Sequence, residues 1–310
     1  MAIKFVGKPI IKADAETREY YGKAPETRSI PELLDSGVII IDKPSGPTSH
    51  QVSAWVRDML GIEKAGHSGT LDPNVTGVLP VALGGGTKLV DELHIGSKEY
   101  VCVMRLHSEV QESRVREVMK PFVGKVQQMV PVRAAVKRQQ RAREIYALEF
   151  LEMRGRDVLF RVECEAGTYV RTLCVDIGKR LGCGANMQEL RRTRTAIFGE
   201  SDLVRLQDLK DALFEWQENK NDAPLRKLVI PMERMVEHIP KIVIRDSAVD
   251  ALCHGANLAL PGVVQVDSGL RKGNLAAVFT LKEEIVAIGA ALMDAREIVE
   301  KVGGFCLDVG

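Results

Sequence analysis

The sequence predicts an α+β protein with a larger domain on a mainly antiparallel mixed sheet and a small, mostly β domain after it. Three observations lead to this prediction. Strand-like and helix-like segments mix between residues 37 and 200 without the steady strand–helix–strand order of a parallel sheet. After Pro240 the pattern changes to short β-rich runs separated by Gly and Pro turns. The chain of 310 residues is long enough for two domains.

The strands of the larger domain are predicted from β-branched runs and from alternation. Residues 37–42 (GVIIID) are a β-branched run that stops at Lys-Pro-Ser-Gly-Pro, which is typical of a strand ending in a turn. Residues 100–106 (YVCVMRL) and 158–164 (VLFRVEC) alternate between apolar and polar side chains. We therefore expect three strands at these places.

The helices of this domain are predicted from apolar residues at helical spacing. Three such stripes are Val52, Val56 and Met59; Val115, Val118, Met119 and Phe122; and Val170, Leu173, Cys174, Ile177 and Leu181. Ser49 is a plausible cap for the first helix, and Gly182 closes the third.

The two ends of the chain differ from its middle. Residues 1–36 have mixed charge and weak periodicity, and we interpret them as an N-terminal arm that packs on the C-terminal domain. The stretch 207–240 is charged and contains a helical piece, LKDALFEWQENK, before a polar linker. We place the larger domain at 37–240 and the small β domain at 241–310.

Composition excludes several classes of protein. With 45% hydrophobic and 27% charged residues the chain is neither disordered nor collagen-like. No apolar run approaches the roughly 20 residues of a membrane span, and the N-terminus lacks a signal-peptide core, so we expect a cytoplasmic protein. Six scattered cysteines show no CxxC pair and no zinc-like spacing, so we expect buried, reduced thiols.

The formal net charge of +1 shows no overall attraction to nucleic acid, but the charge is unevenly placed. Residues 131–146 carry five basic side chains and one acidic one, and residues 171–194 carry six and two. The small β domain is slightly acidic. The basic strips fit either a polyanion-binding surface or solvated helix faces, and charge alone favours neither.

The densest motif is AGHSGTLDPNVTGVLPVALGGGTKL at 65–89, a glycine-rich apolar stretch with one carboxylate, Asp72. Pro73 pushes Asp72 out of the helical region, and a lone Asp-Pro most often only caps a turn. Lys88 follows Thr87, so a phosphate-binding P-loop is rejected, and no GxGxxG follows a strand. HExxH and GxSxG are absent, and no second carboxylate accompanies Asp72 as paired-carboxylate hydrolysis requires.

A second group of polar residues follows at KEY (98–100) and AGTYVRTL (166–173). If residues 167–171 are extended, Tyr169 and Arg171 share a face. An arginine beside a carboxylate keeps that carboxylate ionised and oriented. Taken singly, Tyr169 reads as an ordinary strand aromatic and Arg171 as a surface cation at a helix start.

Taken together, these segments resemble the TruB/dyskerin family of pseudouridine synthases. Six blocks match in the family's order: GVIIIDKPSGPTSH (37–50), AGHSGTLDPNVTGVLPVALGGGTK (65–88), KEY (98–100), VPVRAAVKR (130–138), GTYVRTL (167–173) and QELRRTRT (188–195). Residues 248–279 resemble a PUA RNA-binding domain, although GLRKGN (269–274) lacks the acidic residue that usually follows the glycine. The pattern is most similar to the archaeal catalytic subunit of H/ACA guide-RNA particles.

The resemblance implies a sheet of pseudouridine-synthase type and isomerisation of uridine to pseudouridine in rRNA, with tRNA as a further substrate class. No cofactor and no metal are implied, because the reaction involves no redox change and no hydrolysis. Asp72 matches the nucleophile or base, Arg171 the arginine that pairs with it, and Tyr100 the aromatic that stacks on the base. Tyr169 and Leu190 match the pocket wall, and His67 a residue that fills the gap left by the flipped nucleotide. The Lys43–Pro44 turn reads as structural.

The resemblance also implies contacts with RNA and with other macromolecules. Lys137, Arg138, Arg141 and Arg143 match a thumb loop that contacts phosphates, and Arg191, Arg192 and Arg194 form a second candidate phosphate surface. The expected partners are an H/ACA guide RNA held through its ACA trinucleotide, substrate rRNA or tRNA, and small accessory proteins of the particle.

Two other functions remain open at this stage. One is a guide-independent tRNA synthase that acts on the T-loop uridine. The other is an inactive RNA scaffold, against which the presence of Asp72, Tyr100 and Arg171 speaks. Release of tritium from 5-tritiated uridine, with and without a guide, discriminates among the three.

Overall fold

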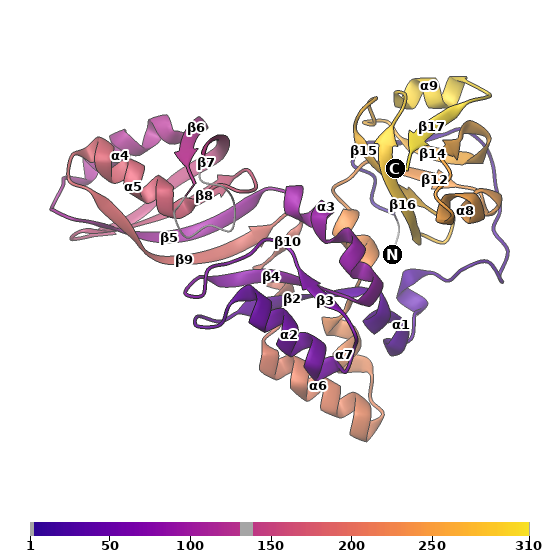
Figure 1. Ribbon diagram of the computed structural model, residues 1–310, viewed down its shortest axis with the longest axis horizontal. Coiled ribbons are helices and arrows are strands. Elements are labelled where there is room, and N and C mark those ends of the chain that lie inside the picture. Colours follow the sequence, from indigo (N-terminus) through magenta and orange to yellow (C-terminus); the bar gives the residue numbers. More distant parts are fainter. Residues whose placement is uncertain (1–2, 131–138, 310) are drawn as a thin grey trace. The chain divides into compact units, whose positions relative to one another are not determined.

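The computed structural model describes residues 3–130 and 139–309, which form two compact units. One unit comprises residues 38–228, and the other combines residues 1–37 with residues 229–310. The α+β class predicted from the sequence is confirmed, with mixed sheets in which most strand pairs are antiparallel. Figure 1 shows the two units with their elements labelled.

The first unit is a sheet covered by helices. Its elements are β2 (Gly37–Lys43), α2 (Ser49–Leu60), β3 (Ala65–His67), β4 (Thr76–Leu83), α3 (Val90–Ile95), β5 (Lys98–Leu106), α4 (Glu112–Met119), β6 (Gly124–Met129), β7 (Gln140–Arg154), β8 (Asp157–Cys164), α5 (Val170–Leu181), β9 (Ala185–Thr195), β10 (Phe198–Gly199), α6 (Leu206–Asn219) and α7 (Ala223–Leu228). The strands lie in the order β2-β4-β9-β5-β8-β7-β6, with β3 on β4 and β10 on β9.

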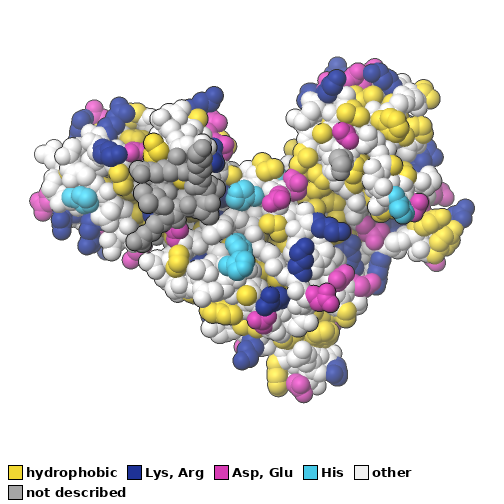
Figure 2. Space-filling model, in the orientation of Figure 1, with side chains coloured by type: hydrophobic (Ala, Val, Ile, Leu, Met, Phe, Trp, Pro, Cys, Tyr) yellow, Lys and Arg dark blue, Asp and Glu magenta, His cyan; other side chains and the backbone are white. Residues whose placement is uncertain are grey.

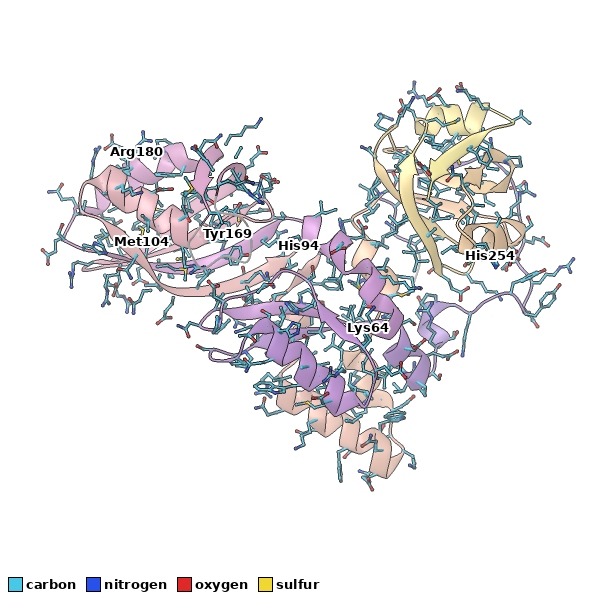
Figure 3. All side chains as sticks on the ribbon, viewed as in Figure 1. Lys64, His94, Met104, Tyr169, Arg180 and His254 are labelled. Carbon is cyan, nitrogen blue, oxygen red and sulfur yellow. The ribbon has the colours of Figure 1, made fainter. Side chains whose placement is uncertain are left out.

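Each half of this sheet has its own helical cover. Helices α4 and α5 lie over the β5–β8 half, and α2 packs against β3 and β4 beside α6 (Figure 1). Met104, labelled in Figure 3, lies in the fully buried core with Cys102 and Phe160, and Ile177 of α5 belongs to the same core. The helical stripe predicted around Leu173 faces this core, and Gly182 ends α5 in the left-handed conformation. These sequence predictions are confirmed.

The predicted cap of α2 is wrong by one residue. Thr48, not Ser49, caps the helix: its Oγ1 accepts a hydrogen bond from the Gln51 amide at 3.1 Å. The Gln51 side chain returns a hydrogen bond from the Thr48 amide at 2.8 Å, which completes a capping box. Ser49 is thereby free to hold the next loop, as described below.

The second unit is a β domain joined to the N-terminal segment. Its elements are β1 (Pro9–Ile11), α1 (Ile30–Asp35), β11 (Ile230–Pro231), β12 (Lys241–Ile244), α8 (Asp246–Cys253), β13 (Leu258–Ala259), β14 (Val263–Asp267), β15 (Leu275–Phe279), β16 (Ile285–Ala291), α9 (Ala295–Glu300) and β17 (Phe305–Asp308). The strand order is β1-β14-β12-β15-β16-β17-β13. Residues 229–240, assigned to the larger domain in the sequence, belong to this unit.

Two carboxylates hold the N-terminal segment to this β domain. Buried Asp267 accepts hydrogen bonds from the backbone amides of Val6 at 2.7 Å and Gly7 at 2.9 Å. Arg28 makes a two-pronged, largely buried ion pair with Glu233 at 2.7 and 3.0 Å. The described residues of this segment are therefore held by the strand pairing of β1, by the hydrogen bonds to the Asp267 carboxylate and by the ion pair of Arg28.

The six cysteines are free thiols, but they are not all buried as expected. Cys102, Cys164, Cys174 and Cys306 are buried, whereas Cys183 is half-buried and Cys253 is exposed at the end of α8. In the described part of the chain no helix is both long and apolar enough to cross a membrane.

The halves of the first unit's sheet meet where β4 runs parallel to β9, with Gly77 opposite Arg192. Gly77 has a φ of +100°, and a Cβ there would lie 2.1 Å from the Arg192 carbonyl oxygen. Only glycine allows the two backbones to approach this closely.

We expect Gly77→Ala to lower the free energy of unfolding by about 3 kcal/mol or more, because it adds both strain and a clash. Gly61→Ala is the matched control. Gly61 also has a positive φ, +64°, but no atom lies within 4 Å of its added Cβ. It should cost only about 1 kcal/mol. Urea unfolding of both variants tests this, and equal losses would contradict the close approach.

Candidate active site

Asp72 lies in the loop 68–75 between β3 and β4, and the loop is anchored on both sides of the carboxylate. Leu71 and Val75 are buried. The Ser49 hydroxyl accepts a hydrogen bond from the Leu71 amide at 2.8 Å and donates to the Leu71 carbonyl at 3.1 Å. Asp72 itself remains 44% exposed. The loop therefore presents one accessible carboxylate on a fixed backbone.

Lys43 anchors the part of this loop that follows Asp72. Its side chain is 0% exposed, and its Nζ donates to the carbonyls of Pro44, Pro73 and Val75, each at 2.9 Å. The three donors of the ammonium group are thus all used. Burial lowers the pKa of Lys43, and the charge of Asp72 acts in the opposite direction. The structural reading of the Lys43–Pro44 turn has a concrete basis in these bonds.

Arg171 meets Asp72 across the site, with 2.9 Å between Nη2 and Oδ2. The expectation of an extended segment through residue 171 is wrong, because α5 begins at Val170 and Tyr169 is its N-cap residue. Arg171 therefore projects from the first turn of α5. Arg171 is 36% exposed, so the ion pair adds little stability and serves mainly to orient the carboxylate.

The three other pocket candidates lie on elements around this ion pair. Tyr100 is partly buried on β5; desolvation raises the pKa of its phenol, and the Arg192 guanidinium opposes that shift. Tyr169, at the start of α5 in Figure 3, exchanges two backbone hydrogen bonds with the Gln128 side chain, at 3.0 and 3.2 Å. Leu190 on β9 stands opposite Cys102 and packs on the core. The sequence analysis did not single out Gln128.

His67 ends β3, five residues before Asp72. Its Nδ1 is 3.5 Å from the Ser53 hydroxyl and its Nε2 is 3.4 Å from the Thr70 hydroxyl. Its ring meets that of His50 edge-on, with 6.0 Å between centroids. Burial, then the charges of His50 and Arg192, lower the pKa of His67. The imidazole is therefore neutral near pH 7.

Arg191 and Arg192 are adjacent on β9, but their side chains point to opposite faces of the sheet. Arg191 pairs with Asp42 at 2.9 Å and Glu200 at 2.7 Å. Arg192 is only 1% exposed, and its Nε donates to the Val78 carbonyl at 2.8 Å. The expectation that Arg192 contacts phosphates is therefore wrong, because its guanidinium lies in the interior.

The thumb strip is described in part. Lys137 and Arg138 lie outside the described residues. Arg141 and Arg143 lie on strand β7, so this part of the basic strip is not a helix face. Arg143 is mostly buried and turns toward Glu165, at 3.7 Å. On the face seen in Figure 2, described basic and acidic side chains are intermixed.

Lys98, the first residue of KEY, has a role that the sequence analysis missed. It is buried, and its Nζ donates to the carbonyls of Leu93, His94 and Gly96 at 3.1, 2.7 and 2.6 Å. Figure 3 labels His94 at this end of α3. Lys98 thus closes α3 and fixes the start of the strand that carries Tyr100. The sequence did contain a signal for this role. Lys98 is two residues before Tyr100, so on a strand the two side chains lie on the same face.

Within the described residues, no group of three or more His, Cys, Asp or Glu side chains could hold a metal ion. The chemistry open to this arrangement is that of one oriented carboxylate beside a fixed cation and a phenol. Such a group can attack an electrophilic carbon or remove a proton.

Sequence models of five protein families match the chain. One, the C-terminal domain of Pus10, matches residues 87–197, and the other four match successive parts of the chain. They are the DKCLD domain at 2–53, the N-terminal domain of TruB family pseudouridylate synthases at 57–114, the C-terminal domain of tRNA pseudouridylate synthase B at 171–237, and the PUA domain at 240–309.

Individual proteins match over nearly the whole chain. The probable tRNA pseudouridine synthase B of Methanosarcina barkeri is 53% identical over 94% of this chain and 87% of its own. That of Archaeoglobus fulgidus is 53% identical over 96% and 92%. In a solved Cbf5-Nop10-Gar1 complex, one chain matches with a TM-score of 0.93 at 50% identity, over 98% of this chain and 93% of that one. An H/ACA RNP bound to a substrate RNA containing 2′-deoxyuridine gives 0.92 at 48% identity, over 98% and 93%.

The buried Lys98 predicts a distinct pH dependence of stability. Burial, then the charge of Arg192, lowers its pKa from 10.5 to about 8. Between these values the unfolded chain binds a proton that the folded chain does not, so stability rises with pH by at most about 1.4 kcal/mol per unit. Relative to Lys98→Met, the wild-type protein should gain stability from pH 8 to 10.5.

Urea unfolding at stepped pH measures this difference. Lys88→Met is the control, because Lys88 is an exposed lysine of the same region. Its difference from wild type should stay constant with pH. A constant difference for Lys98→Met as well would mean that the ammonium is not destabilised by burial.

Proposed function

The chain belongs to the TruB/Cbf5 family of pseudouridine synthases, and we propose that it is the catalytic subunit of a guide-directed H/ACA particle. As a pseudouridine synthase it is an isomerase. The observation that carries the proposal for its active site is the Asp72–Arg171 ion pair on a loop held by Lys43 and Ser49.

The reaction breaks the N1–C1′ bond of uridine, rotates the base and joins C5 to C1′. The C5 proton is lost and N1 gains one, so atoms and charge balance without a cofactor. We assign to Asp72 the attack on C1′ or C6, or the removal of the C2′ proton to give a glycal. Arg171 orients the Asp72 carboxylate toward the substrate through their ion pair.

The remaining candidates receive roles that follow from their positions. Tyr100 stacks on the flipped base and assists the loss of the C5 proton. Tyr169 and Leu190 form the wall of the base pocket. Neutral His67, at the edge of the Asp72 loop, occupies the gap that the flipped uridine leaves in its RNA. Arg141 and Arg143, with Lys137 and Arg138, contact phosphates.

Partners of this chain are inferred from the particles in which its structural relatives occur. One relative is in a complex with Nop10 and Gar1, and another is in an H/ACA RNP with substrate RNA. We assign to this chain a guide RNA, a substrate RNA and small accessory proteins, working in the cytoplasm. The β unit, with its PUA match at 240–309, would hold the ACA end of the guide, and residues 1–36 would support it.

A second function, guide-independent modification of the tRNA T-loop, is favoured by one observation. Relatives from several archaea are named probable tRNA pseudouridine synthase B. Both activities use the same Asp72 chemistry and differ only in how the RNA is presented.

Asp72→Asn should abolish product while RNA binding stays within a few-fold, because the carboxylate acts in the chemical step and not on phosphates. Single-turnover rates and filter binding measure the two effects. Asp58→Asn is the control, because Asp58 is an exposed aspartate paired with Arg57 on α2. A residual rate above about one hundredth of wild type in Asp72→Asn would exclude Asp72 as the nucleophile.

Replacing the ACA trinucleotide of the guide should weaken guide binding markedly and leave any guide-free activity on tRNA much less affected. Tritium release from 5-tritiated uridine reports product, because C5 exchanges its hydrogen for C1′. The assay compares ACA guide, altered guide and no guide on rRNA and tRNA substrates. Equal binding of both guides would argue against the anchoring role and for the guide-independent tRNA function.

A further inference from the structure

Arg192 is a buried cation that the chemistry described so far does not use. It lies at the junction of β4, β9 and β5, opposite Gly77 on one side and Tyr100 on the other. Removing a guanidinium from water is costly, so a buried arginine requires a compensating role.

A β-bulge brings Arg192 and Tyr100 together. Along β5 and β9 the register runs from Glu99 opposite Arg194 to Tyr100 opposite Arg192, which leaves Thr193 as the extra residue. Directly opposed residues share a face of the sheet. Without the bulge, Thr193 would oppose Tyr100 and Arg192 would face the other way.

The guanidinium is hydrogen-bonded near the start of β4, the strand that follows the Asp72 loop, and it lies against the loop itself. Its Nε donates to the Val78 carbonyl at 2.8 Å. Gly69, with a φ of +70°, lies against it so closely that a Cβ would be 2.9 Å from Nη1. A change in the position of the Asp72 loop would therefore move Arg192, because Arg192 contacts Gly69 in the loop and Val78 in the strand directly after it.

The same guanidinium faces the phenol of Tyr100. Desolvation raises the pKa of Tyr100 most; the charge of Arg192 and, to a smaller extent, a side-chain hydrogen bond with it lower that pKa. Cys164 and Asp72 also face the phenol, and both raise its pKa. The charge of Arg192 also contributes to lowering the pKa values of three other groups, Lys98, His67 and His94.

One donor of the guanidinium remains unused. Nη2 is buried and has no hydrogen-bond partner among the described residues. An unpartnered donor in an interior is costly, so this group calls for an explanation. Nη2 belongs to a side chain that contacts both the Asp72 loop and Tyr100.

We propose that Arg192 is a positioning residue for the reaction, which fixes the Tyr100 phenol relative to the Asp72 loop. The inference rests on the proposed role of Tyr100. A guanidinium can only donate, so a phenol oxygen that faces it must accept. The phenol proton then points away from Arg192, and the ring is held at a fixed distance from the loop that carries Asp72.

Arg192→Lys and Arg192→Met test the proposal. Both should slow the single-turnover rate, with Met losing about 10²-fold and Lys retaining part of the rate, since a small misplacement costs about that much. RNA affinity and the slope of log K against log salt should not change, whereas loss of a phosphate contact would lower that slope by about one. Arg105→Lys is the control, because Arg105 is an exposed arginine on β5 that is paired with Asp157.

Coupling to Tyr100 supplies a readout that loss of stability alone does not move. In a Tyr100→Phe background, Arg192→Met should slow the reaction by less than about threefold further.

With 3-fluorotyrosine incorporated, ¹⁹F NMR resolves the five tyrosines, and Tyr100→Phe assigns the signal of residue 100. Loss of the guanidinium should raise the pKa of fluorotyrosine 100. Gly69→Ala displaces the guanidinium without removing it and should shift the same signal, so the test stands if Arg192→Met does not fold.

The outcomes separate this inference from the proposed function. A Tyr100→Phe variant with the wild-type rate would remove the role proposed for Tyr100, and this inference with it. A slow Tyr100→Phe variant combined with an unshifted Tyr100 pKa in Arg192→Lys and Gly69→Ala would overturn the role of Arg192 alone. A lower salt slope in the Arg192 variants would also overturn it.

Discussion

The buried ammonium group of Lys43 is the interaction on which the active-site geometry depends. Its three hydrogen bonds bind the carbonyls of Pro44, Pro73 and Val75, so the turn after β2 and the loop after Asp72 share one cation. Ser49 fixes the other side of the loop through Leu71. Because the backbone on both sides is held, the exposed Asp72 carboxylate needs only Arg171 to orient it. An ion pair of small net stability can therefore determine the direction of a catalytic group.

A second constraint joins this loop to the rest of the sheet. At the parallel contact of β4 with β9, Gly77 lets the two backbones approach, and Arg192 directly beyond it bonds Val78 and faces Tyr100. The Asp72 carboxylate comes from the loop before β4, the Tyr100 phenol from β5 and the Arg192 guanidinium from β9. Lys98, like Lys43, is a buried lysine whose ammonium group donates to three backbone carbonyls. These carbonyls lie at the end of α3 and directly before β5, the strand that carries Tyr100.

Basic residues in this protein serve two different purposes that a charge count does not separate. Four of them are buried and donate hydrogen bonds to backbone carbonyls, so they stabilise the local backbone and are not available to RNA: Lys43, Lys98, Lys241 and Arg192. Arg191 has two carboxylate neighbours, which reduce its attraction for a phosphate. The surface left for RNA is therefore smaller than the basic strips suggest, in keeping with recognition by shape and backbone contacts.

The sequence by itself determined the strands at 37–42, 100–106 and 158–164, the apolar face of α5, and the choice of Asp72 and Arg171 as partners. Those features depend on periodicity over a few residues, on turn chemistry, or on motifs that resemble a family. The tertiary structure alone decided that Arg192 is interior while Arg191 is not, that Thr48 caps α2 so that Ser49 is free for Leu71, and that Lys98 closes α3. The physical reason is that a side chain's environment is set by which strand becomes its neighbour and where a bulge such as Thr193 shifts the register.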